Sequence, residues 1–581
     1  MLIIRLSSLI ILVLLSGCAS SPIESVVSQE SDIQDKPVET KVKVPPKEVK
    51  TAIAPEVLYM LLAAELAGQR GQYEVALEGY MEAAKRVDDP RFAERAASIA
   101  MYMKNSGKTD EALSIWLSQD PKGVMPRKLA ALSALRSGEK SLAVEHINAL
   151  IKADPVDFED TLLELVGVLQ KEDKAAFVFD VLETVSKTNA DIPVTYFVQS
   201  LLAMQINKKD VAEQKVQKAL ALRPNWDSAL ILQAQIALAA NDVGRAKQIL
   251  LDASNLLPDS EKIKKMFGQL LVKNGEYSQA VDIYQALITK NPKDTDAQFN
   301  LALLNLQLGL DKKAEDLLTG LLGQAGWRER ATLYLGRIEE SRGNSKKALG
   351  WFDKVVEGPY AFESAMSGVS LLAKDKQFND ASSRLDSLTK KYPNQKLRIT
   401  LIRASIYNQQ GQFTKAFDLL TQGLVEQPDQ KDLLYTRAIM AGRLGKLELL
   451  KVDLKKILLK YPDDFEALNA LGYSLLDDPK SYDEAEIYLN KALKLRPAEA
   501  IIIDSYGWLQ FKLGRLDQAL SYLEQAYEKQ PEGEIAAHLC EVLWVLGRQE
   551  EAKAIFSKAI KDNPADEYLL GFQKRVLNGP K

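Results

Sequence analysis

Residues 465–564 decide the fold, because they hold one pattern three times. Residues 465–497 read FEALNALGYSLLDDPKSYDEAEIYLNKALKLRP, residues 498–531 read AEAIIIDSYGWLQFKLGRLDQALSYLEQAYEKQP, and residues 532–564 read EGEIAAHLCEVLWVLGRQEEAKAIFSKAIKDNP. The interval is about 34 residues, which suits two short antiparallel helices and the turns that join them. We therefore predict that each copy is one helix-turn-helix repeat.

The spacing of small residues explains how the two helices of a copy can pack. Each copy has one small residue, two alanines and a closing proline: Gly472, Ala485, Ala492 and Pro497, then Gly507, Ala519, Ala526 and Pro531, then Cys540, Ala552, Ala559 and Pro564. Small side chains let helix backbones approach closely, and proline ends the second helix because it has no N–H group to donate. We expect Gly514 and Gly547 at the turns between helices, in a left-handed conformation.

This interval and these positions resemble the tetratricopeptide repeat (TPR). The resemblance implies an all-α fold, a TPR α-solenoid built as a right-handed superhelix of about fifteen helix-turn-helix repeats with a C-terminal capping helix. We predict the superhelix over residues 55–564 and the capping helix and tail over residues 565–581.

The pattern extends towards the N-terminus with two irregularities. Residues near 160–190 keep a helical periodicity without the small residues, so we expect a degenerate repeat there. The repeat that ends at Pro462 has Leu450 in place of alanine, so its helices must pack slightly further apart. Alanines mark the other repeats: Ala76, Ala112, Ala143, Ala212, Ala246, Ala280, Ala314, Ala348, Ala381 and Ala416.

The first twenty residues, MLIIRLSSLIILVLLSGCAS, have the features of an export signal. Arg5 precedes an apolar run over residues 6–15, which is too short to span a membrane comfortably. The sequence LSGC at residues 15–18 resembles the bacterial lipobox, whose cysteine is lipidated and becomes the mature N-terminus. We predict a lipoprotein signal peptide over residues 1–17 and lipidation of Cys18; the alternative is an uncleaved anchor helix.

Residues 18–54 are predicted to form a lipidated N-terminus and a disordered tether. They are rich in Ser, Glu, Lys, Val and Pro, contain no aromatic residue and show no helical periodicity. Ala19 follows the cysteine, whereas aspartate at that position favours inner-membrane retention in the sorting rule known for enterobacterial lipoproteins. The resemblance therefore implies an outer-membrane, lipid-anchored protein that faces the periplasm.

Composition argues against several classes of function. The net charge is only −4, so we expect no nucleic-acid partner, which would require a broad basic face. The chain has two histidines, His146 and His538, far apart in the repeats, so we expect no catalytic residue, no metal and no cofactor. Cys540 occupies a small-residue position, which favours a buried structural thiol over a reactive one.

The candidate partner-binding residues lie on first helices of the C-terminal repeats. In TPR proteins the first helix of each repeat lines the concave groove, and this resemblance places aromatic residues and one arginine there. Such residues anchor partners at protein interfaces; for each of them, burial between repeats is the alternative. The candidates are Tyr435, Arg443, Tyr473, Trp508 and Phe511.

The combination of lipobox, polar tether and TPR array resembles a family of outer-membrane lipoproteins found in pseudomonads and their relatives. The stretches LNALGYSL, DSYGWLQFKLGRLDQAL and AAHLCEVLWVLGRQEEA are similar to that family, although Cys540 stands where the family pattern has glycine. Its members bind and activate a periplasmic carboxyl-terminal processing protease. The resemblance implies a non-catalytic adaptor with that protease as partner, and with its cell-wall hydrolase substrates as further partners.

Two other readings stay open. One is a scaffold of an envelope assembly system, such as polysaccharide export or pilus biogenesis. The other is an enzyme whose site lies in the degenerate fourth repeat, for which the scarcity of histidine leaves few mechanisms.

Overall fold

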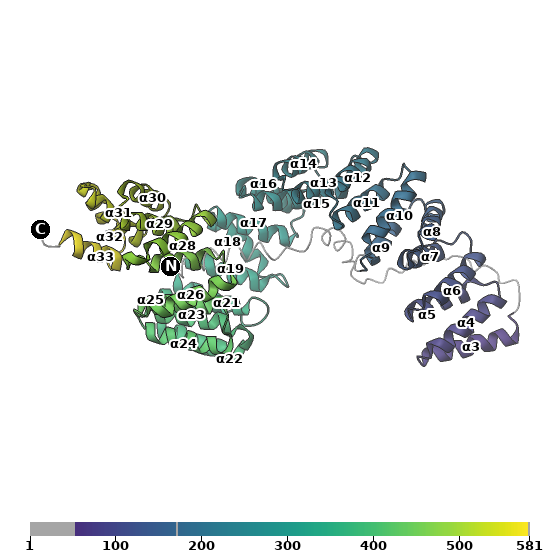
Figure 1. Ribbon diagram of the computed structural model, residues 1–581. Coiled ribbons are helices and arrows are strands. Elements are labelled where there is room, and N and C mark those ends of the chain that lie inside the picture. Colours follow the sequence, from purple (N-terminus) through teal and green to yellow (C-terminus); the bar gives the residue numbers. More distant parts are fainter. Residues whose placement is uncertain (1–52, 170–171, 579–581) are drawn as a thin grey trace. The chain divides into compact units, whose positions relative to one another are not determined.

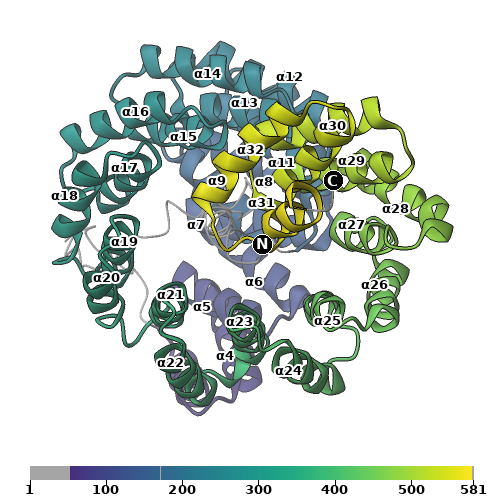
Figure 2. The same cartoon turned by 90° about the vertical axis from the view of Figure 1, so that its left-hand side faces the viewer.

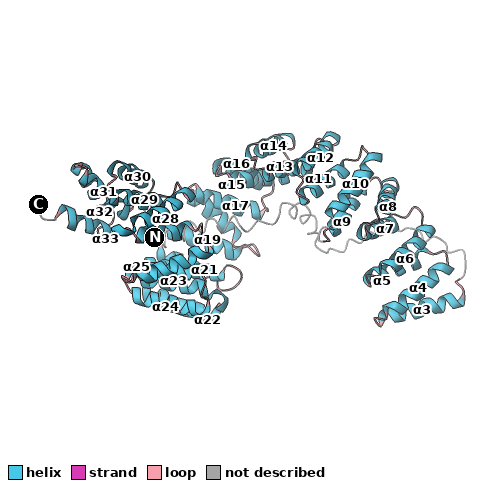
Figure 3. Ribbon diagram, viewed as in Figure 1, coloured by secondary structure: helices cyan, strands magenta, loops and turns pink. Residues whose placement is uncertain are grey.

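The computed structural model describes residues 53–169 and 172–578, and within these ranges it contains helices and no strand (Figure 3). The predicted signal peptide, the lipidated Cys18 and nearly all of the predicted tether lie outside the described residues. None of the helices in the described ranges is both long enough and apolar enough to cross a bilayer.

Contacts divide the chain into an N-terminal half that ends at Leu321 and a C-terminal half that begins at Leu322. Helices with odd numbers open the repeats and those with even numbers close them (Figure 1). The helices of the N-terminal half are α3 (Pro55–Gln69), α4 (Tyr73–Arg86), α5 (Pro90–Tyr102), α6 (Ser106–Gln119), α7 (Val124–Ser137), α8 (Lys140–Ala153), α9 (Phe158–Leu169), α10 (Ala175–Thr188), α11 (Pro193–Gln205), α12 (Lys209–Leu222), α13 (Asp227–Ala239), α14 (Val243–Leu256), α15 (Glu261–Lys273), α16 (Tyr277–Lys290), α17 (Thr295–Gln307) and α18 (Asp311–Leu321).

The C-terminal half continues the alternation and adds one unpaired helix, α33. Its helices are α19 (Arg328–Ser341), α20 (Ser345–Phe352), α21 (Ala361–Lys374), α22 (Phe378–Lys391), α23 (Lys396–Gln409), α24 (Phe413–Glu426), α25 (Lys431–Arg443), α26 (Leu447–Lys460), α27 (Phe465–Ser474), α28 (Tyr482–Leu495), α29 (Ala500–Lys512), α30 (Leu516–Lys529), α31 (Gly533–Val545), α32 (Gln549–Asp562) and α33 (Glu567–Phe572). From α3 to α32 the described residues form fifteen helix pairs, so the predicted all-α solenoid is confirmed.

Small residues allow the close helix contacts that the sequence predicted. A Cβ atom added to Gly336 of α19 would lie 2.5 Å from the ring of Phe352 of α20. A Cβ atom at Gly507 of α29 would lie 2.9 Å from Leu523 of α30. In both repeats a large side chain of the second helix occupies the space that glycine leaves on the first.

The turn between the two helices of a repeat uses a left-handed residue. Gly514 and Gly547 have φ values of 75° and 79°, as predicted. Other repeats place a residue with a side chain there at φ between 50° and 61°, at some cost in backbone strain; these are Lys104, Asp173, Asn207, Asn241 and Lys376.

Leu450 is accommodated by a second departure from the pattern. Its side chain is buried in α26, and a Cβ atom at Gly442 of the facing helix α25 would lie 2.9 Å from Leu450 Cδ1. A missing side chain on one helix therefore makes room for the additional carbons on the other.

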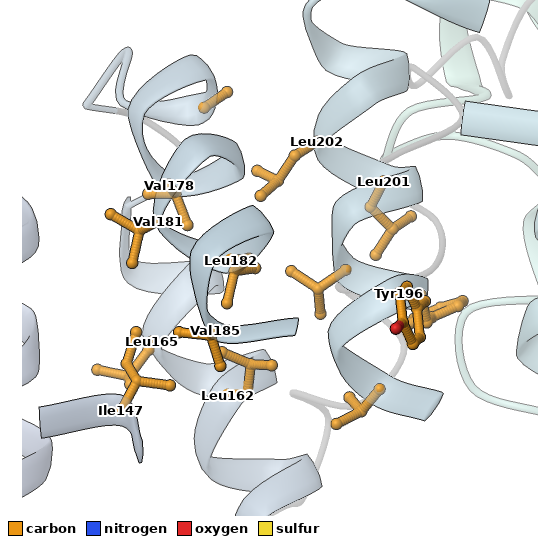
Figure 4. Close-up of a cluster of buried hydrophobic side chains, with 14 of the residues drawn as sticks. Ile147, Leu162, Leu165, Val178, Val181, Leu182, Val185, Tyr196, Leu201 and Leu202 are labelled. Atoms are coloured by element: carbon orange, nitrogen blue, oxygen red, sulfur yellow. The ribbon is translucent and has the colours of Figure 1, made fainter. Parts of the chain in front are cut away.

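The predicted degenerate repeat consists of α9 and α10, and its packing is aliphatic. Figure 4 shows Leu162 and Leu165 of α9 beside Val181 and Val185 of α10. They belong to a buried cluster that also contains Ile147 of α8 and reaches α11. Branched side chains thus fill the seams that alanines fill in the regular repeats.

The predicted capping helix is α33, which continues as a π-helical turn at Gln573–Leu577. Leu569 and Phe572 are fully buried, and the Phe572 ring lies 5.7 Å from the Phe556 ring of α32. Tyr568 and Val576 pack against the same cluster. The helix covers the apolar face that the last repeat would otherwise expose to water.

Candidate partner-binding surface

The first helices of the C-terminal half form its inner layer. In Figure 2, α19, α21, α23, α25 and α27 lie on the inside of the curve, and α20, α22, α24, α26 and α28 lie outside. The side chains that the first helices turn away from their second helices therefore line the inner surface of this half.

Trp508 of α29 is held between two other rings. The His538 ring of α31 stacks on it with centroids 4.0 Å apart and planes at 15°, and the Phe511 ring lies 4.8 Å away. Lys512 Nζ lies 4.9 Å from its centroid. Only 9 % of Trp508 is exposed, so most of this predicted anchor packs against the protein itself.

His538 has a hydrogen-bond partner for each of its ring nitrogens. Nδ1 lies 3.0 Å from both carboxylate oxygens of Asp504 on α29, and Nε2 lies 3.4 Å from the Tyr473 hydroxyl of α27. Burial by itself would lower the pKa of His538, but the charge and hydrogen bond of Asp504 outweigh burial and raise it. The doubly protonated ring can donate to both partners.

Glu534 of α31 accepts hydrogen bonds from two phenols. The Tyr473 hydroxyl donates to Glu534 Oε1 over 2.9 Å, and Tyr568 of α33 also bonds to this carboxylate. Burial raises the pKa of Glu534, and it raises the pKa of both tyrosines as well, so both phenols remain donors. Asp504, His538, Tyr473, Glu534 and Tyr568 thus form one network, which we call the inner polar network.

Arg443 at the end of α25 forms an ion pair with Glu567 at the start of α33. The two residues are 124 positions apart in the chain, yet their side chains touch. Both groups are largely exposed, so the pair contributes little to stability. The ion pair shows that α25 and α33 lie close together on the inner side.

The five predicted anchors therefore fall into two groups. Tyr473 and Trp508 contact His538, Phe511 stacks on Trp508, and Arg443 joins them through Glu567 and its neighbour Tyr568. Tyr435 lies apart, half-buried against the cluster formed by α23 to α27. Their role in binding a partner stays a prediction.

Sequence reasoning did not place five members of this arrangement at the site: Asp504, Glu534, His538, Glu567 and Tyr568. One signal was present. Asp504 and His538 are separated by 34 positions, which is one repeat, so they occupy nearly equivalent places on neighbouring first helices. Equivalent places on stacked repeats lie side by side, and an acid beside a histidine could have been inferred.

The Cys540 thiol and the His538 ring are both engaged within the protein. The Cys540 thiol is fully buried and donates to the Ala552 carbonyl oxygen over 3.3 Å, and burial raises its pKa to about 12. Both ring nitrogens of His538 are engaged with side chains of the network. In the described ranges, no three His, Cys, Asp or Glu side chains are grouped so that they could hold a metal ion.

Comparison with known proteins finds tetratricopeptide-repeat matches over parts of the chain. Tetratricopeptide-repeat family models match residues 265–329 and 450–500, and a second such model matches residues 510–576. The last match covers the end of α29 and all of α30 to α33, and it includes Glu534, His538 and Tyr568 of the inner polar network.

Relatives of similar length are also repeat proteins. A TPR repeat-containing protein of Pseudomonas aeruginosa is 29 % identical over 539 residues, which cover 92 % of this chain and 90 % of that protein. A TPR repeat-containing protein of Methanocaldococcus jannaschii is 24 % identical over 424 residues, 65 % of this chain and 71 % of that one. The solved structure of yeast Tom70 covers 90 % of this chain and 99 % of its own, with 14 % identity and a TM-score of 0.39. The two TPR repeat-containing relatives agree with the matching family models in indicating an array of helical repeats.

Proposed function

We propose that this protein is a lipid-anchored periplasmic adaptor that binds a carboxyl-terminal processing protease, activates it and presents substrates to it. The observation that carries the proposal is the array of fifteen helix pairs, whose first helices give the C-terminal half a continuous inner surface. Each repeat adds area to such a surface, so a large partner can be held with little ordering of the array. The protease is proposed as the partner because the lipobox and the C-terminal stretches resemble the family of lipoproteins that bind it.

The anchor is the second part of the proposal. Lipidation of Cys18 would hold the folded array at the periplasmic face of the outer membrane, and Ala19 supports that membrane over the inner one. Labelling cells with a clickable palmitate and separating the two membranes on a density gradient tests this. The label should follow the wild type into the outer-membrane fraction and be absent from Cys18→Ser. Labelled protein in the inner membrane would contradict the sorting step.

Reconstitution tests activation directly. The Cys18→Ser protein, a PDZ-containing serine protease of the carboxyl-terminal processing class and the loosely folded substrate β-casein are mixed with and without the array. We expect a stable complex on a sizing column and at least tenfold faster cleavage when the array is present. Equal cleavage with and without it would reject activation, and recovery of export or pilus components instead of a protease from cells would favour the assembly scaffold.

The inner surface can be tested in the same assay with two arginines of equal exposure. Arg443 lies on the inner side at the end of α25, whereas Arg548 immediately precedes α32, the second helix of the last repeat; their side chains are 40 % and 39 % exposed. Arg443→Gln, alone and combined with Tyr435→Ala, should weaken protease binding by roughly tenfold, in the range of interface anchors. Arg548→Gln should leave binding unchanged. The same loss in both arginine variants would place the contact elsewhere.

A further inference from the structure

Helix α3 carries a wide apolar face that is open to solvent in the described structure. Leu58, Tyr59, Leu62 and Leu66 are 50 %, 74 %, 58 % and 52 % exposed. No charged residue occurs from Val57 to Ala64. We call these four side chains the α3 face.

The α3 face results from the position of α3 at the start of the array. On its other side, Val57, Ala64 and Ala67 are buried, and a Cβ atom at Gly79 of α4 would lie 2.8 Å from Ala64 Cβ. Later first helices of the N-terminal half pack against the repeat before them, and no earlier helix precedes α3 in the described residues. An array end of this kind normally has a polar outer face or a capping helix. Here the end is apolar.

We propose that the α3 face docks on the surface of the lipid bilayer to which the chain is anchored. The inference rests on the lipid anchor of the proposed function. Residues 19–54 separate Cys18 from α3, and the polar tether that their composition predicts would span roughly 30–35 Å. The α3 face is therefore the part of the array held nearest to the membrane.

The short distance to the anchor means that a weak affinity is sufficient. A group on a short flexible linker meets its binding site at an effective concentration in the millimolar range. Leucine and tyrosine are suited to the boundary between headgroups and acyl chains, where an amphipathic helix lies in the plane of the membrane. α3 itself contains Glu56 and Glu65, and only Arg70 follows it as a basic residue, so apolar contact drives the docking and anionic lipid is not required.

A second copy of the chain fits the α3 face less well. Three half-exposed leucines and one tyrosine offer an area on the order of 400–500 Å². A stable interface between proteins buries about 800 Å² on each partner. The face is too small to support a stable dimer alone, whereas a tethered membrane contact needs no such area.

Vesicle flotation of an unlipidated protein that begins at residue 18 with Cys18→Ser, and so lacks the apolar run at residues 6–15, tests docking separately from anchoring. Vesicles of phosphatidylcholine, and of phosphatidylethanolamine with phosphatidylglycerol, are used at lipid concentrations in the millimolar range. The test variant combines Leu58→Gln, Leu62→Gln and Leu66→Gln. The matched control combines Leu449→Gln, Val452→Gln and Leu459→Gln, which remove exposed apolar side chains from α26, where exposures are 43 %, 59 % and 89 %. Circular dichroism verifies that all proteins are folded.

We expect the parent protein and the α26 control to float with both kinds of vesicle. The vesicle-bound fraction of the α3 variant should be at least tenfold lower than that of the parent protein. Leu62→Cys labelled with an environment-sensitive fluorophore gives a second readout, because the buried Cys540 does not react. Its emission should shift to shorter wavelength with vesicles, and a label on Val425→Cys, at a 79 % exposed position of α24, should not shift.

Three results would overturn the inference. They are no flotation of the parent protein, equal flotation of the parent and α3 variant, and a concentration-dependent dimer by light scattering that the α3 variant abolishes without any vesicle binding. Activation of the protease in solution needs no vesicles, so it is measured on the same α3 variant. If the parent protein activates the protease but does not dock on vesicles, this inference fails and the proposed function stands. If it docks on vesicles but does not activate the protease, the proposed function fails and the docking stands.

Discussion

His538 lies with its Nδ1 atom 3.0 Å from both carboxylate oxygens of Asp504, and both residues are almost completely buried. The other groups that face this histidine are the Tyr473 hydroxyl, the carboxylates of Glu534 and Glu541, and the Trp508 ring. Negative charge therefore dominates around the ring, which is why its pKa is raised in spite of burial.

This pair predicts a dependence of stability on pH. Since the folded pKa of His538 is above the unfolded value, the pair contributes its full stabilisation below about pH 6.5. That contribution is lost as the pH rises through the folded pKa. The raised pKa of Glu534 acts in the same direction. Protection of the α31 segment, residues 533–545, against hydrogen exchange should therefore fall as the pH rises above about 6.5, after correction for intrinsic rates.

Asp504→Asn is the informative variant for that measurement. It keeps the shape of the side chain but removes the charge that raises the pKa of His538, so the decline in protection over this pH range should disappear. Asp483→Asn, on the exposed side of α28, is the matched control and should behave as the wild type does. An unchanged pH dependence in Asp504→Asn would contradict the assignment to this pair.

The Cys540 thiol should be inert in the folded protein. Its pKa of about 12 leaves almost no thiolate at neutral pH, and the sulfur is fully buried. With Cys18→Ser protein, Ellman's reagent should give no signal under native conditions and one equivalent after denaturation in guanidinium. Prompt reaction of the native protein would show that α31 and α32 open readily.

Two glycines of one repeat should respond in opposite ways to alanine. Gly336→Ala places a methyl group against the Phe352 ring and should destabilise the repeat by about 1–3 kcal/mol. Gly350 of α20 faces open space, so Gly350→Ala should stabilise its helix by about 0.5–1 kcal/mol. Urea unfolding of both variants beside the wild type measures the difference. Equal effects would show that the α19–α20 contact is looser than its geometry indicates.

The buried side chains of the capping helix α33 should stabilise the last repeat. Phe572→Ala removes a fully buried ring and should cost about 3–5 kcal/mol in the last repeat. Leu570→Ala, on the 43 % exposed side of the same helix, should change stability by about 0.5 kcal/mol or less. Limited proteolysis of the segment after Gly533 measures the loss of stability in both variants. Similar sensitivity in the two variants would mean that α33 does not hold the end of the array closed.

Much of the fold follows from the sequence because the contacts that determine it are local. Helix pairs, turn glycines and the buried side of α33 depend on residues within one repeat or its neighbour, and the spacing of alanine and proline records them. The positive φ values at Asn207 and Lys376 could not be foreseen, because neither residue marks a turn as clearly as glycine does.

The candidate surface was only partly predictable for a different reason. Tyr473 contacts Glu534 and His538, which lie two repeats further along, and that approach depends on how strongly successive repeats curve. Period and composition do not determine curvature. The sequence therefore indicated that Trp508 lies on a first helix, but not that His538 would cover its ring.

The contact of Tyr473 with α31 has a thermodynamic consequence. The stability of a repeat array is commonly described as a sum of the intrinsic stability of each repeat and the interaction between adjacent repeats. In that description terminal repeats can unfold one at a time. Here α27 touches α31 without α29 as intermediary, and α25 touches α33. The C-terminal repeats are therefore coupled beyond adjacent repeats. Their thermal unfolding transition should be sharper than a model with interactions between adjacent repeats alone allows.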